Sequence, residues 1–306
     1  MTIGGRISSS WERDGLAGTL QRSALYLLRR VGWRSDAWTK ALDHRITEHA
    51  ILRNYGSLLK RNEKFRNCHK GQRCFVIGNG PSLNEQDLTP LANEITFVAN
   101  YFHHHPIVSE SWQPKYYCLT DPAYFDGREP VELMHDIVAK IPAAAFFVPH
   151  YAAGFLSETR ALPEDRTYYV GLCGGLEEEW NELPDFTGVT PGVQTVVQLG
   201  IMAGMFMGCS TIYLMGLDHN WLSHGGTPMN FYSKEDAKSQ PQGNVGGWDY
   251  KSLMVAMTTI WRVYEMHQRI AERYGIKIVN VTAGGFLDVF ERARYEDIIA
   301  AADERR

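Results

Sequence analysis

The chain has 306 residues, of which 44% are hydrophobic, 12% aromatic and 22% charged, and its formal net charge is −4. This composition is typical of a globular protein and excludes disordered, collagen-like and disulfide-scaffold classes. The five cysteines, an odd number without a C-x-x-C pair, argue against a disulfide framework or a zinc ribbon and favour a reducing compartment. Glu12 and Asp14 interrupt any signal-peptide pattern, and the apolar run 193–207 is too short to span a bilayer. We therefore expect a cytoplasmic protein.

The charge is unevenly distributed along the chain. Residues 1–70 contain 14 Lys and Arg against 6 Asp and Glu, whereas residues 71–306 contain 17 against 29. A basic segment ahead of an acidic body points to a partner of its own, and anionic lipid, an acidic protein, nucleic acid or a merely solvated surface all fit. Because residues 16–66 read as mostly helical, we predict a basic helical extension over 1–70 and one domain over 71–306.

After residue 70 the pattern changes to short, continuous apolar runs that alternate with helical or loop segments. Continuous runs are typical of strands buried on both faces of a parallel sheet, so we predict a doubly wound, mostly parallel α/β domain. Residues 223–248, rich in Gly, Ser, Pro, Gln and Asn, are predicted to form a lid. The predicted strands span 74–77, 95–99, 116–119, 144–148, 168–170, 212–215 and 276–281.

Polar residues and glycines follow the predicted strands at their carboxyl ends, where open α/β sheets bind ligands. We expect these residues to converge on one crevice. They are Gly78, Asn79, Gly80 and Ser82 after the first strand, Asn100 after the second, Asp121 after the third, Asp218, His219 and Asn220 after the sixth, and Thr282 after the last.

Two segments are candidates for phosphate binding at a helix N-terminus. Ser82 and Glu85 form a capping-box pattern that predicts a helix starting near residue 83, although the motif is neither G-x-G-x-x-G nor a P-loop. In the segment 190–193, which precedes a predicted helix over 194–207, Thr190 is a good N-cap and Pro191 suits the first helical position. Gly192 would leave the N–H groups uncovered for an oxygen-rich ligand. A plain turn and a plain capped core helix are the structural alternatives.

The histidines fall into two groups. Residues 103–105 are three consecutive histidines that are expected to form a solvated loop, because three neighbours do not all face one ion. His219 and His224 follow Asp218 beside the predicted lid, and each is either a general base with a near-neutral pKa or a structural histidine. Asp218 could bind a metal ion, a ribose hydroxyl or the amides of its own loop. The absence of a D-x-D pair before it argues against a site that requires a divalent metal ion.

The order of these motifs resembles the bacterial sialyltransferases of lipooligosaccharide synthesis and the related group of motility accessory factors and 6-hydroxymethylpterin diphosphokinase-like proteins. The resemblance rests on residues 74–83, Asn100, residues 190–193 and residues 212–218, and it covers about residues 71–290. It implies a modified Rossmann-like fold that binds a CMP-activated nonulosonic acid without a metal. By the same resemblance, Gly78, Asn79, Gly80 and Ser82 would contact the nucleotide and its phosphate, Asn100 and Asp121 would face the donor, and Thr190, Pro191, Gly192 and Val193 would contact donor and sugar.

The sequence departs from that family at the reaction centre. The family's catalytic histidine lies in the lid region, but no histidine occurs here between His224 and His267, which leaves His219 and His224 as candidate bases. Asn220 stands where the family has one of two phosphate-binding tyrosines, and Tyr232 is the nearest candidate for the other. Asp121 replaces an asparagine and adds negative charge, so a different donor or a metal is compatible with this site.

The leading hypothesis is a glycosyltransferase of bacterial surface polysaccharide synthesis that uses a nucleotide-activated sugar, with a CMP-linked acidic sugar as one candidate, and neither cofactor nor metal. Its acceptor would be a glycan or lipid-linked glycan, so residues 1–70 are expected to contact anionic lipid at the inner membrane rather than nucleic acid. One alternative is a 6-hydroxymethylpterin-type diphosphokinase that uses ATP and magnesium held by Asp121 and Asp218. The other is a non-catalytic nucleotide-binding protein.

Overall fold

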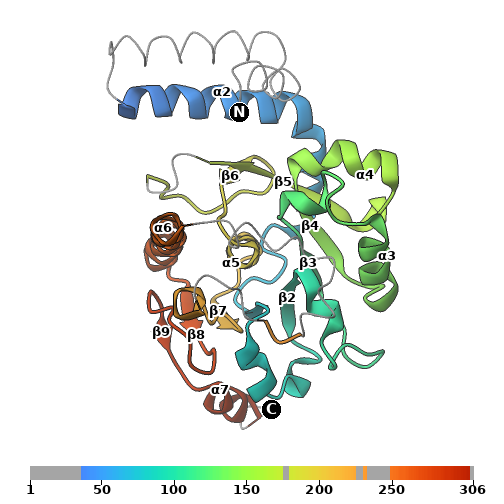
Figure 1. Ribbon diagram of the computed structural model, residues 1–306, viewed down its shortest axis with the longest axis vertical. Helices are drawn as coiled ribbons and strands as arrows, with labels where there is room; N and C mark the ends of the chain where they lie inside the picture. Colours follow the sequence, from blue (N-terminus) through green and yellow to red (C-terminus); the bar gives the residue numbers. More distant parts are fainter. Residues whose placement is uncertain (1–35, 175–178, 225–229, 233–248, 304–306) are drawn as a thin grey trace.

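The chain folds around one open nine-stranded sheet in which every neighbouring pair of strands is parallel. The computed structural model describes residues 36–174, 179–224, 230–232 and 249–303. The order across the sheet is β6-β5-β4-β3-β2-β1-β7-β8-β9 (Figure 1). The strands are β1 (Arg73–Ile77), β2 (Ile95–Ala99), β3 (Tyr116–Cys118), β4 (Ala145–Pro149), β5 (Thr167–Cys173), β6 (Val189–Pro191), β7 (Thr211–Met215), β8 (Lys277–Asn280) and β9 (Glu291–Arg292).

The strand order reverses at β1. The chain proceeds from β1 outward through β2 to β6 and then returns to the other side of β1 with β7, whose Met215 pairs with Ile77. At such a reversal the connections leave the carboxyl edge in opposite directions and open a crevice, which is the usual ligand site of doubly wound folds. The predicted fold class is therefore confirmed, and the crevice is expected beyond Ile77 and Met215.

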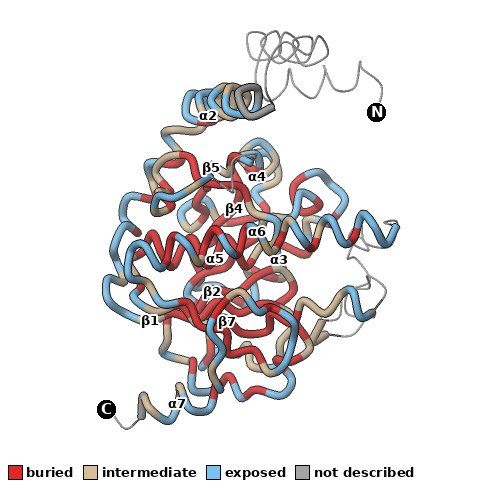
Figure 2. The backbone as a smooth tube through the Cα atoms, turned by 90° about the vertical axis from the view of Figure 1, so that its left-hand side faces the viewer, coloured by how far each residue is buried: buried red, intermediate tan, exposed pale blue. Residues whose placement is uncertain are grey.

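Helices cover both faces of the sheet, and Figure 2 shows the buried residues concentrated between them. One face packs against α5 and α6 through residues such as Val76 and Phe97, and the other packs against α3 and α4 through residues such as Phe75 and Tyr117. Short 3-10 helices (η) join many of the elements. The α-helices are α2 (Asp36–Lys60), α3 (Val131–Lys140), α4 (Ala153–Thr159), α5 (Val196–Phe206), α6 (Tyr250–Tyr274) and α7 (Tyr295–Asp303).

Helix α5 is enclosed between the sheet and α6, so it is apolar on all sides. Two glycines allow its close approach to β1. A Cβ at Gly200 would lie 2.8 Å from the Val76 side chain, and one at Gly204 would lie 3.1 Å from Cys74 Sγ. This close packing fixes the N-terminal end of α5 at the carboxyl edge of the sheet.

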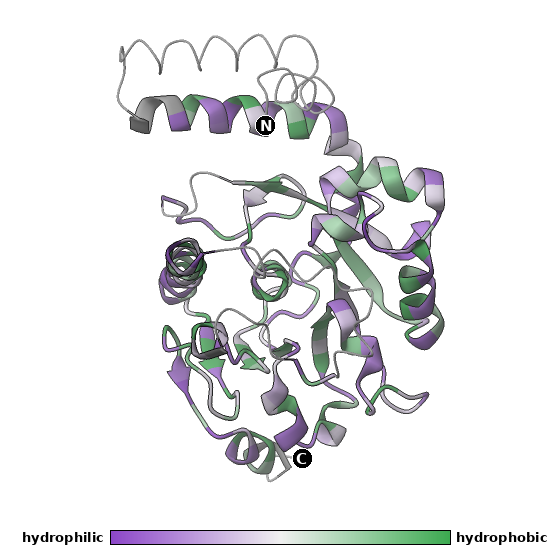
Figure 3. Cartoon of the chain, viewed as in Figure 1, coloured by the Kyte–Doolittle hydropathy of each residue, from purple (hydrophilic) through white to green (hydrophobic). Residues whose placement is uncertain are grey.

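The helical segment before β1 packs on the sheet. Ile51 and Leu59 of α2 are buried in the core, and the Nδ2 of the buried Asn62 donates to the carbonyls of Tyr169 (2.7 Å) and Phe186 (2.8 Å). Figure 3 shows hydrophobic and hydrophilic residues interspersed along α2, unlike the mainly hydrophobic strands. The domain boundary near residue 70 stays a prediction, but packing continues across it.

Most predicted strands are confirmed to within a few residues, and the helix predicted over 194–207 is α5. The capping role predicted for Thr190 and the helix predicted near residue 83 are wrong. Strand β6 was missed, and Thr190 and Pro191 lie in it instead of opening a helix, because Leu172 of β5 pairs with Thr190. Residues Pro81–Glu85 form the 3-10 helix η2 rather than a helix capped by Ser82. Within the segment 16–66 that is predicted to be mostly helical, α2 is confirmed as a helix, whereas residues 1–35 lie outside the described part. None of the described helices is long and apolar enough to cross a bilayer.

Candidate functional site

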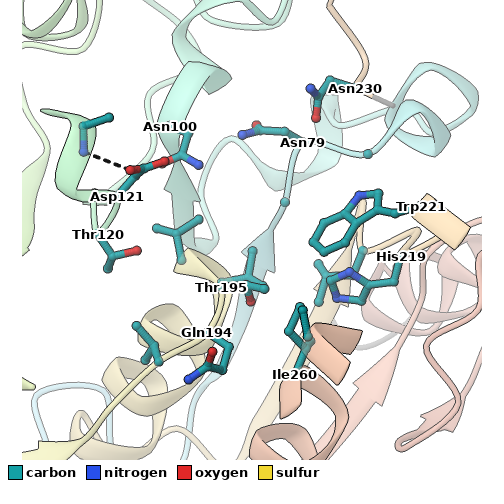
Figure 4. Close-up of a pocket in the computed structure, with 18 of the residues that line it drawn as sticks. Asn79, Asn100, Thr120, Asp121, Gln194, Thr195, His219, Trp221, Asn230 and Ile260 are labelled. Carbon is teal, nitrogen blue, oxygen red and sulfur yellow. Dashed lines mark hydrogen bonds between the residues drawn. The ribbon is translucent and has the colours of Figure 1, made fainter. Parts of the chain in front are cut away.

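A cleft of about 690 Å³ opens at the carboxyl edge of the sheet, where β1, β2, β3 and β7 end (Figure 4). In the close-up, Asn100, Thr120 and Asp121 lie on one side of the cleft, and His219 and Trp221 lie opposite. Ten of the predicted site residues line it, and they come from segments that are far apart in the sequence. They are Gly78, Asn79, Gly80, Asn100, Asp121, Gly192, Val193, Asp218, His219 and Tyr232.

The turn after β1 is held against the turn after β7 so closely that only glycine fits at two positions. A Cβ at Gly78 would lie 2.6 Å from the Gly216 carbonyl oxygen, and one at Gly80 would lie 1.7 Å from Asp218 Oδ2. Asp218 accepts hydrogen bonds from the Ser82 hydroxyl (2.7 Å) and backbone amide (3.3 Å). Burial raises the pKa of the Asp218 carboxyl, although the hydrogen bonds from Ser82 oppose the shift. Asp218 thus joins the two turns that form the base of the cleft.

Two asparagine side chains present acceptors to the cleft. Asn79 donates its Nδ2 to the Ala99 carbonyl (3.1 Å), which fixes the orientation of the amide and leaves Oδ1 as the acceptor. Asn100 adopts the left-handed conformation (φ +52°) at the end of β2. Both Oδ1 atoms are buried and have no hydrogen-bond partner among the described residues. Because a buried acceptor without a donor costs stability, these oxygens suit the hydroxyl or amino groups of a ligand.

The described lining of the cleft contains carboxylates but no lysine or arginine. Asp121 accepts a hydrogen bond from the Ala123 amide (2.9 Å), which stabilises the turn after β3. Glu129 is 3% exposed and its Oε1 accepts from the Tyr101 hydroxyl (3.3 Å). An anionic ligand would therefore be held by main-chain amides and side-chain dipoles, since no described cation faces it.

The N-terminus of α5 supplies such a dipole. The N-cap of this helix is Thr195, five residues after the predicted Thr190, and Thr195 and Gln198 form a reciprocal capping box. Val196 and Val197, the first residues of the helix, line the cleft. The partial positive charge at a helix N-terminus favours phosphate and carboxylate groups. The helix end for which anion binding is predicted therefore lies at Thr195 rather than Thr190.

His219 stands at the opposite wall in a hydrogen-bonded chain. Its Nε2 lies 2.8 Å from the Tyr264 hydroxyl, which lies 3.2 Å from Thr195 Oγ1. The residue has a left-handed backbone (φ +46°), and its ring is flanked by Trp221 and Trp261. Burial lowers the pKa of His219 to about 4, so the imidazole is neutral at pH 7. A neutral imidazole at the rim of a cleft can accept a proton from a bound hydroxyl.

Five other predicted site residues do not line the described part of the cleft, namely Ser82, Thr190, Pro191, Asn220 and Thr282. Thr190 and Pro191 are buried in β6, and Asn220 lies beyond the lining. Thr282 Oγ1 accepts from the Leu217 amide (3.1 Å) and so supports the turn after β7 from behind. The backbone of His224 ends η8 (Trp221–His224), and its side chain lies outside the described part, as does most of the predicted lid. Within that lid, Phe231 donates its amide to the Asn79 carbonyl (3.0 Å).

Several residues of the cleft were not predicted. Thr195 had a readable signal in the Thr-x-x-Gln capping box, whereas Thr120, Glu129, Tyr151 and Trp221 have no local pattern that marks them. The expected solvated loop at residues 103–105 is wrong for His103, which is 2% exposed in the 3-10 helix η4 (Asn100–His104). Burial, with a smaller contribution from His104, lowers the pKa of His103 to about 3.

No family model and no curated protein matches the sequence. Among solved structures, the chain is similar to the sialyltransferase CstII from Campylobacter jejuni in complex with the substrate analogue CMP-3FNeuAc, with 16% identity over 72% of this chain and 86% of that chain and a TM-score of 0.45. It is also similar to CstII in complex with cytidine-5'-monophosphate (15% identity, 73% and 85% covered, TM-score 0.43). A third similar structure is the sialyltransferase CST-II in complex with a trisaccharide acceptor and CMP. It has 15% identity over 72% of this chain and 85% of that chain, and a TM-score of 0.42.

Proposed function

We propose that this protein is a glycosyltransferase that uses a nucleotide-activated sugar. The observation that carries the proposal is the convergence of the motif residues Gly78, Asn79, Gly80, Asn100 and Asp218 on one cleft at the point where the strand order reverses. Those motifs, in that order, resemble the sialyltransferase-like group. The cleft volume of about 690 Å³ suits a nucleotide joined to a sugar, because ligand sites of this class occupy roughly 300–1,000 Å³.

The chemistry of the lining fits the parts of such a donor. The Oδ1 acceptors of Asn79 and Asn100 suit ribose hydroxyls or the amino group of a base, and the N-terminus of α5 suits a phosphate. The carboxylate of Asp121 suits the hydroxyls of a sugar, as an acceptor of hydrogen bonds. The finer assignment, a CMP-linked acidic sugar and a surface glycan acceptor, rests on the motif resemblance.

His219 is proposed as the general base. An acceptor hydroxyl oxygen would bond to the anomeric carbon as the bond from that carbon to the phosphate oxygen breaks, and the hydroxyl proton would pass to His219. The leaving nucleotide takes the electron pair as phosphate charge, which the amides at the start of α5 stabilise. Tyr264 and Thr195 are positioning residues, since the Tyr264 hydroxyl contacts the imidazole and the Thr195 hydroxyl contacts that of Tyr264.

The donor is identified by a screen of the full chain. Thermal shifts with CMP, CDP, UDP, GDP and ATP, with and without magnesium, are followed by chromatography of the nucleotide released from activated sugars. We expect one nucleotide to raise the melting temperature and its activated sugars to be hydrolysed slowly without an acceptor. AMP formed from ATP with strict magnesium dependence would instead indicate the diphosphokinase. Nucleotide binding without turnover across a panel of acceptors would indicate a non-catalytic protein.

The magnesium-dependent alternative finds little support in the two aspartates. Asp218 is 8% exposed and engaged by Ser82, and Asp121 is engaged by the Ala123 amide. Among the described residues, neither belongs to a group of three metal-ligating side chains with converging ligand atoms.

We also propose that the basic segment 1–70 contacts anionic lipid, where a lipid-linked acceptor would be presented. Lys40, Arg45, Arg53 and Lys60 are exposed along α2. Each basic residue near an anionic surface adds about 1 kcal/mol of attraction, which salt screens. The full chain should sediment with vesicles that contain phosphatidylserine at low salt and not with neutral vesicles. Equal recovery with both kinds would mean that the basic segment is only a solvated surface.

A further inference from the structure

Behind one wall of the cleft, the 3-10 helix η4 and the helix α3 bring two histidines and a carboxylate together. One ring nitrogen each of His103 and His104 and a carboxylate oxygen of Asp136 all lie within 4.8 Å of one another. His103 is buried, whereas His104 and Asp136 are partly exposed at the surface. None of these three residues lines the cleft, although Asn100 and Tyr101 at the start of η4 do.

The hydrogen bonds around His103 determine where its proton lies. The Tyr117 hydroxyl donates to the Asn100 carbonyl, so its oxygen can only accept from His103. That oxygen lies 3.3 Å from both the His103 backbone amide and the ring Nδ1. The ring must therefore carry its proton on Nδ1, and in a neutral imidazole Nε2 is left with a lone pair.

The Nε2 atom lies close to another acceptor. His103 Nε2 is buried without a hydrogen-bond partner among the described residues, and it lies 3.4 Å from Asp136 Oδ2. Two acceptors at this separation repel unless a cation lies between them. In a tetrahedral zinc site with bonds of about 2.0–2.1 Å, the separation of two ligand atoms is roughly 3.3–3.4 Å. The observed separation of 3.4 Å matches that of two ligands of one metal ion.

We propose that His103, His104 and Asp136 bind a divalent transition-metal ion, with zinc as the ion that this ligand set favours. Two imidazoles and one carboxylate would leave a fourth position for water. The Tyr117 hydroxyl would accept the hydrogen bond from His103 Nδ1 and so orient the ring, as the hydrogen-bond partners of ligating histidines do in zinc sites. The ion would fasten η4 to α3 and thereby stiffen the wall of the cleft that Asn100 and Tyr101 form.

Lys140 is the cation that competes with this ion. Its Nζ lies 3.0 Å from Asp136 Oδ2, one helical turn along α3. The side chains of Lys140 and Asp136 are 41% and 42% exposed, so the ammonium can turn to solvent when a metal arrives. His103 is buried, so its ring cannot rotate toward solvent. Its Nε2 lone pair therefore has no cation to bind among the described residues, since Lys140 is not a partner of this nitrogen. Removal of Lys140 is therefore expected to tighten metal binding.

The test uses the full chain, freed of metal by a chelator and titrated with zinc and with cobalt(II), whose visible spectrum reports tetrahedral coordination. His104→Gln and Asp136→Asn change partly exposed ligands and should leave the fold intact, as circular dichroism checks. His135→Gln is the matched control, because His135 is an exposed histidine next to Asp136 on α3. Lys140→Met removes the competing cation.

We expect one equivalent of zinc, a tetrahedral cobalt spectrum without thiolate charge transfer, and a rise in melting temperature with zinc. Each ligand substitution should weaken binding by a factor of about ten or more, His135→Gln should not, and Lys140→Met should bind at least as tightly as the natural chain. The proposal is overturned if the double variant His104→Gln/Asp136→Asn binds zinc as well as the natural chain. It is also overturned if no metal binds, or if thiolate charge transfer places the ion at the cysteines.

Discussion

Replacement of Gly80 by alanine perturbs the junction between the two turns that form the base of the cleft. Gly80 has φ −65° and ψ 153°, a conformation that alanine adopts freely, so the backbone contributes no penalty. The added Cβ would lie 1.7 Å from Asp218 Oδ2 and 2.7 Å from the Gly216 carbonyl oxygen. Steric overlap alone therefore decides the effect of this substitution.

The expected cost follows from the contacts that must move. Asp218 has to leave Ser82 and lose two hydrogen bonds to its carboxylate, each worth roughly 1.5–3 kcal/mol. The Gly216 carbonyl, which also accepts from the Gly80 amide (2.9 Å), can withdraw only by a backbone shift that costs about 1–3 kcal/mol. We expect Gly80→Ala to lower the free energy of unfolding by about 4 kcal/mol or more and to abolish nucleotide binding.

Urea unfolding followed by tryptophan fluorescence measures the cost. Gly154→Ala is the control, because a Cβ at Gly154 in α4 meets nothing within 4 Å and alanine is the better helix former by about 1 kcal/mol. The double variant Gly80→Ala/Asp218→Ala should be less destabilised than the two single effects added together, since removing the carboxylate makes room for the methyl group. A Gly80→Ala chain within about 1 kcal/mol of the natural chain would refute this description of the junction.

Three further predictions concern caps, buried histidines and the reaction. Thr195→Ala should cost about 1 kcal/mol of stability as a lost helix cap, whereas Thr190→Val should be neutral or stabilising in the same denaturation assay, because its buried hydroxyl has no partner among the described residues. His267 is fully buried, and burial lowers its pKa to about 3. Between pH 6.5 and about 3 the imidazole is therefore protonated in the unfolded chain but not in the folded chain, so the free energy of unfolding decreases as the pH falls. Between pH 6.5 and 5 the free energy of unfolding should decrease by about 2 kcal/mol through this residue. The same pH dependence of stability in His267→Phe and in the natural chain would contradict this prediction. Because the pKa of His219 is about 4, kcat/KM should fall with acid only below about pH 5, and a loss centred near pH 6.5 would point to an exposed histidine instead.

The sequence was informative where local patterns and tertiary structure agree. The continuous apolar runs of β1, β2 and β7 had to be central strands, because no other element buries both faces of so short a segment. Their ends placed Gly78, Asn100 and Asp218 at one edge of the sheet, which is why those residues do line the cleft.

Where the prediction failed, pairing over long sequence distances decided the structure. Thr190 and Pro191 have the local pattern of a helix start, but they pair with the edge of β5 and form a strand. The helix begins only at the next capping box, at Thr195. His103 looked solvated because neither the left-handed turn at Asn100 nor the approach of Asp136 can be read from neighbouring residues.

The turnover of an activated sugar in two matched variants tests whether His219 is the general base of a glycosyltransferase. His219 and His150 are both histidines whose pKa burial lowers to about 4, but of the two only His219 lines the cleft. Nucleotide release and transfer are measured for His219→Gln and His150→Gln at equal folded fraction. We expect His219→Gln to lower kcat by roughly 10²–10⁴-fold, whereas His150→Gln should stay within a few-fold of the natural chain. Equal turnover in the two variants, or no release of nucleotide by the natural chain from any activated sugar, would contradict this expectation.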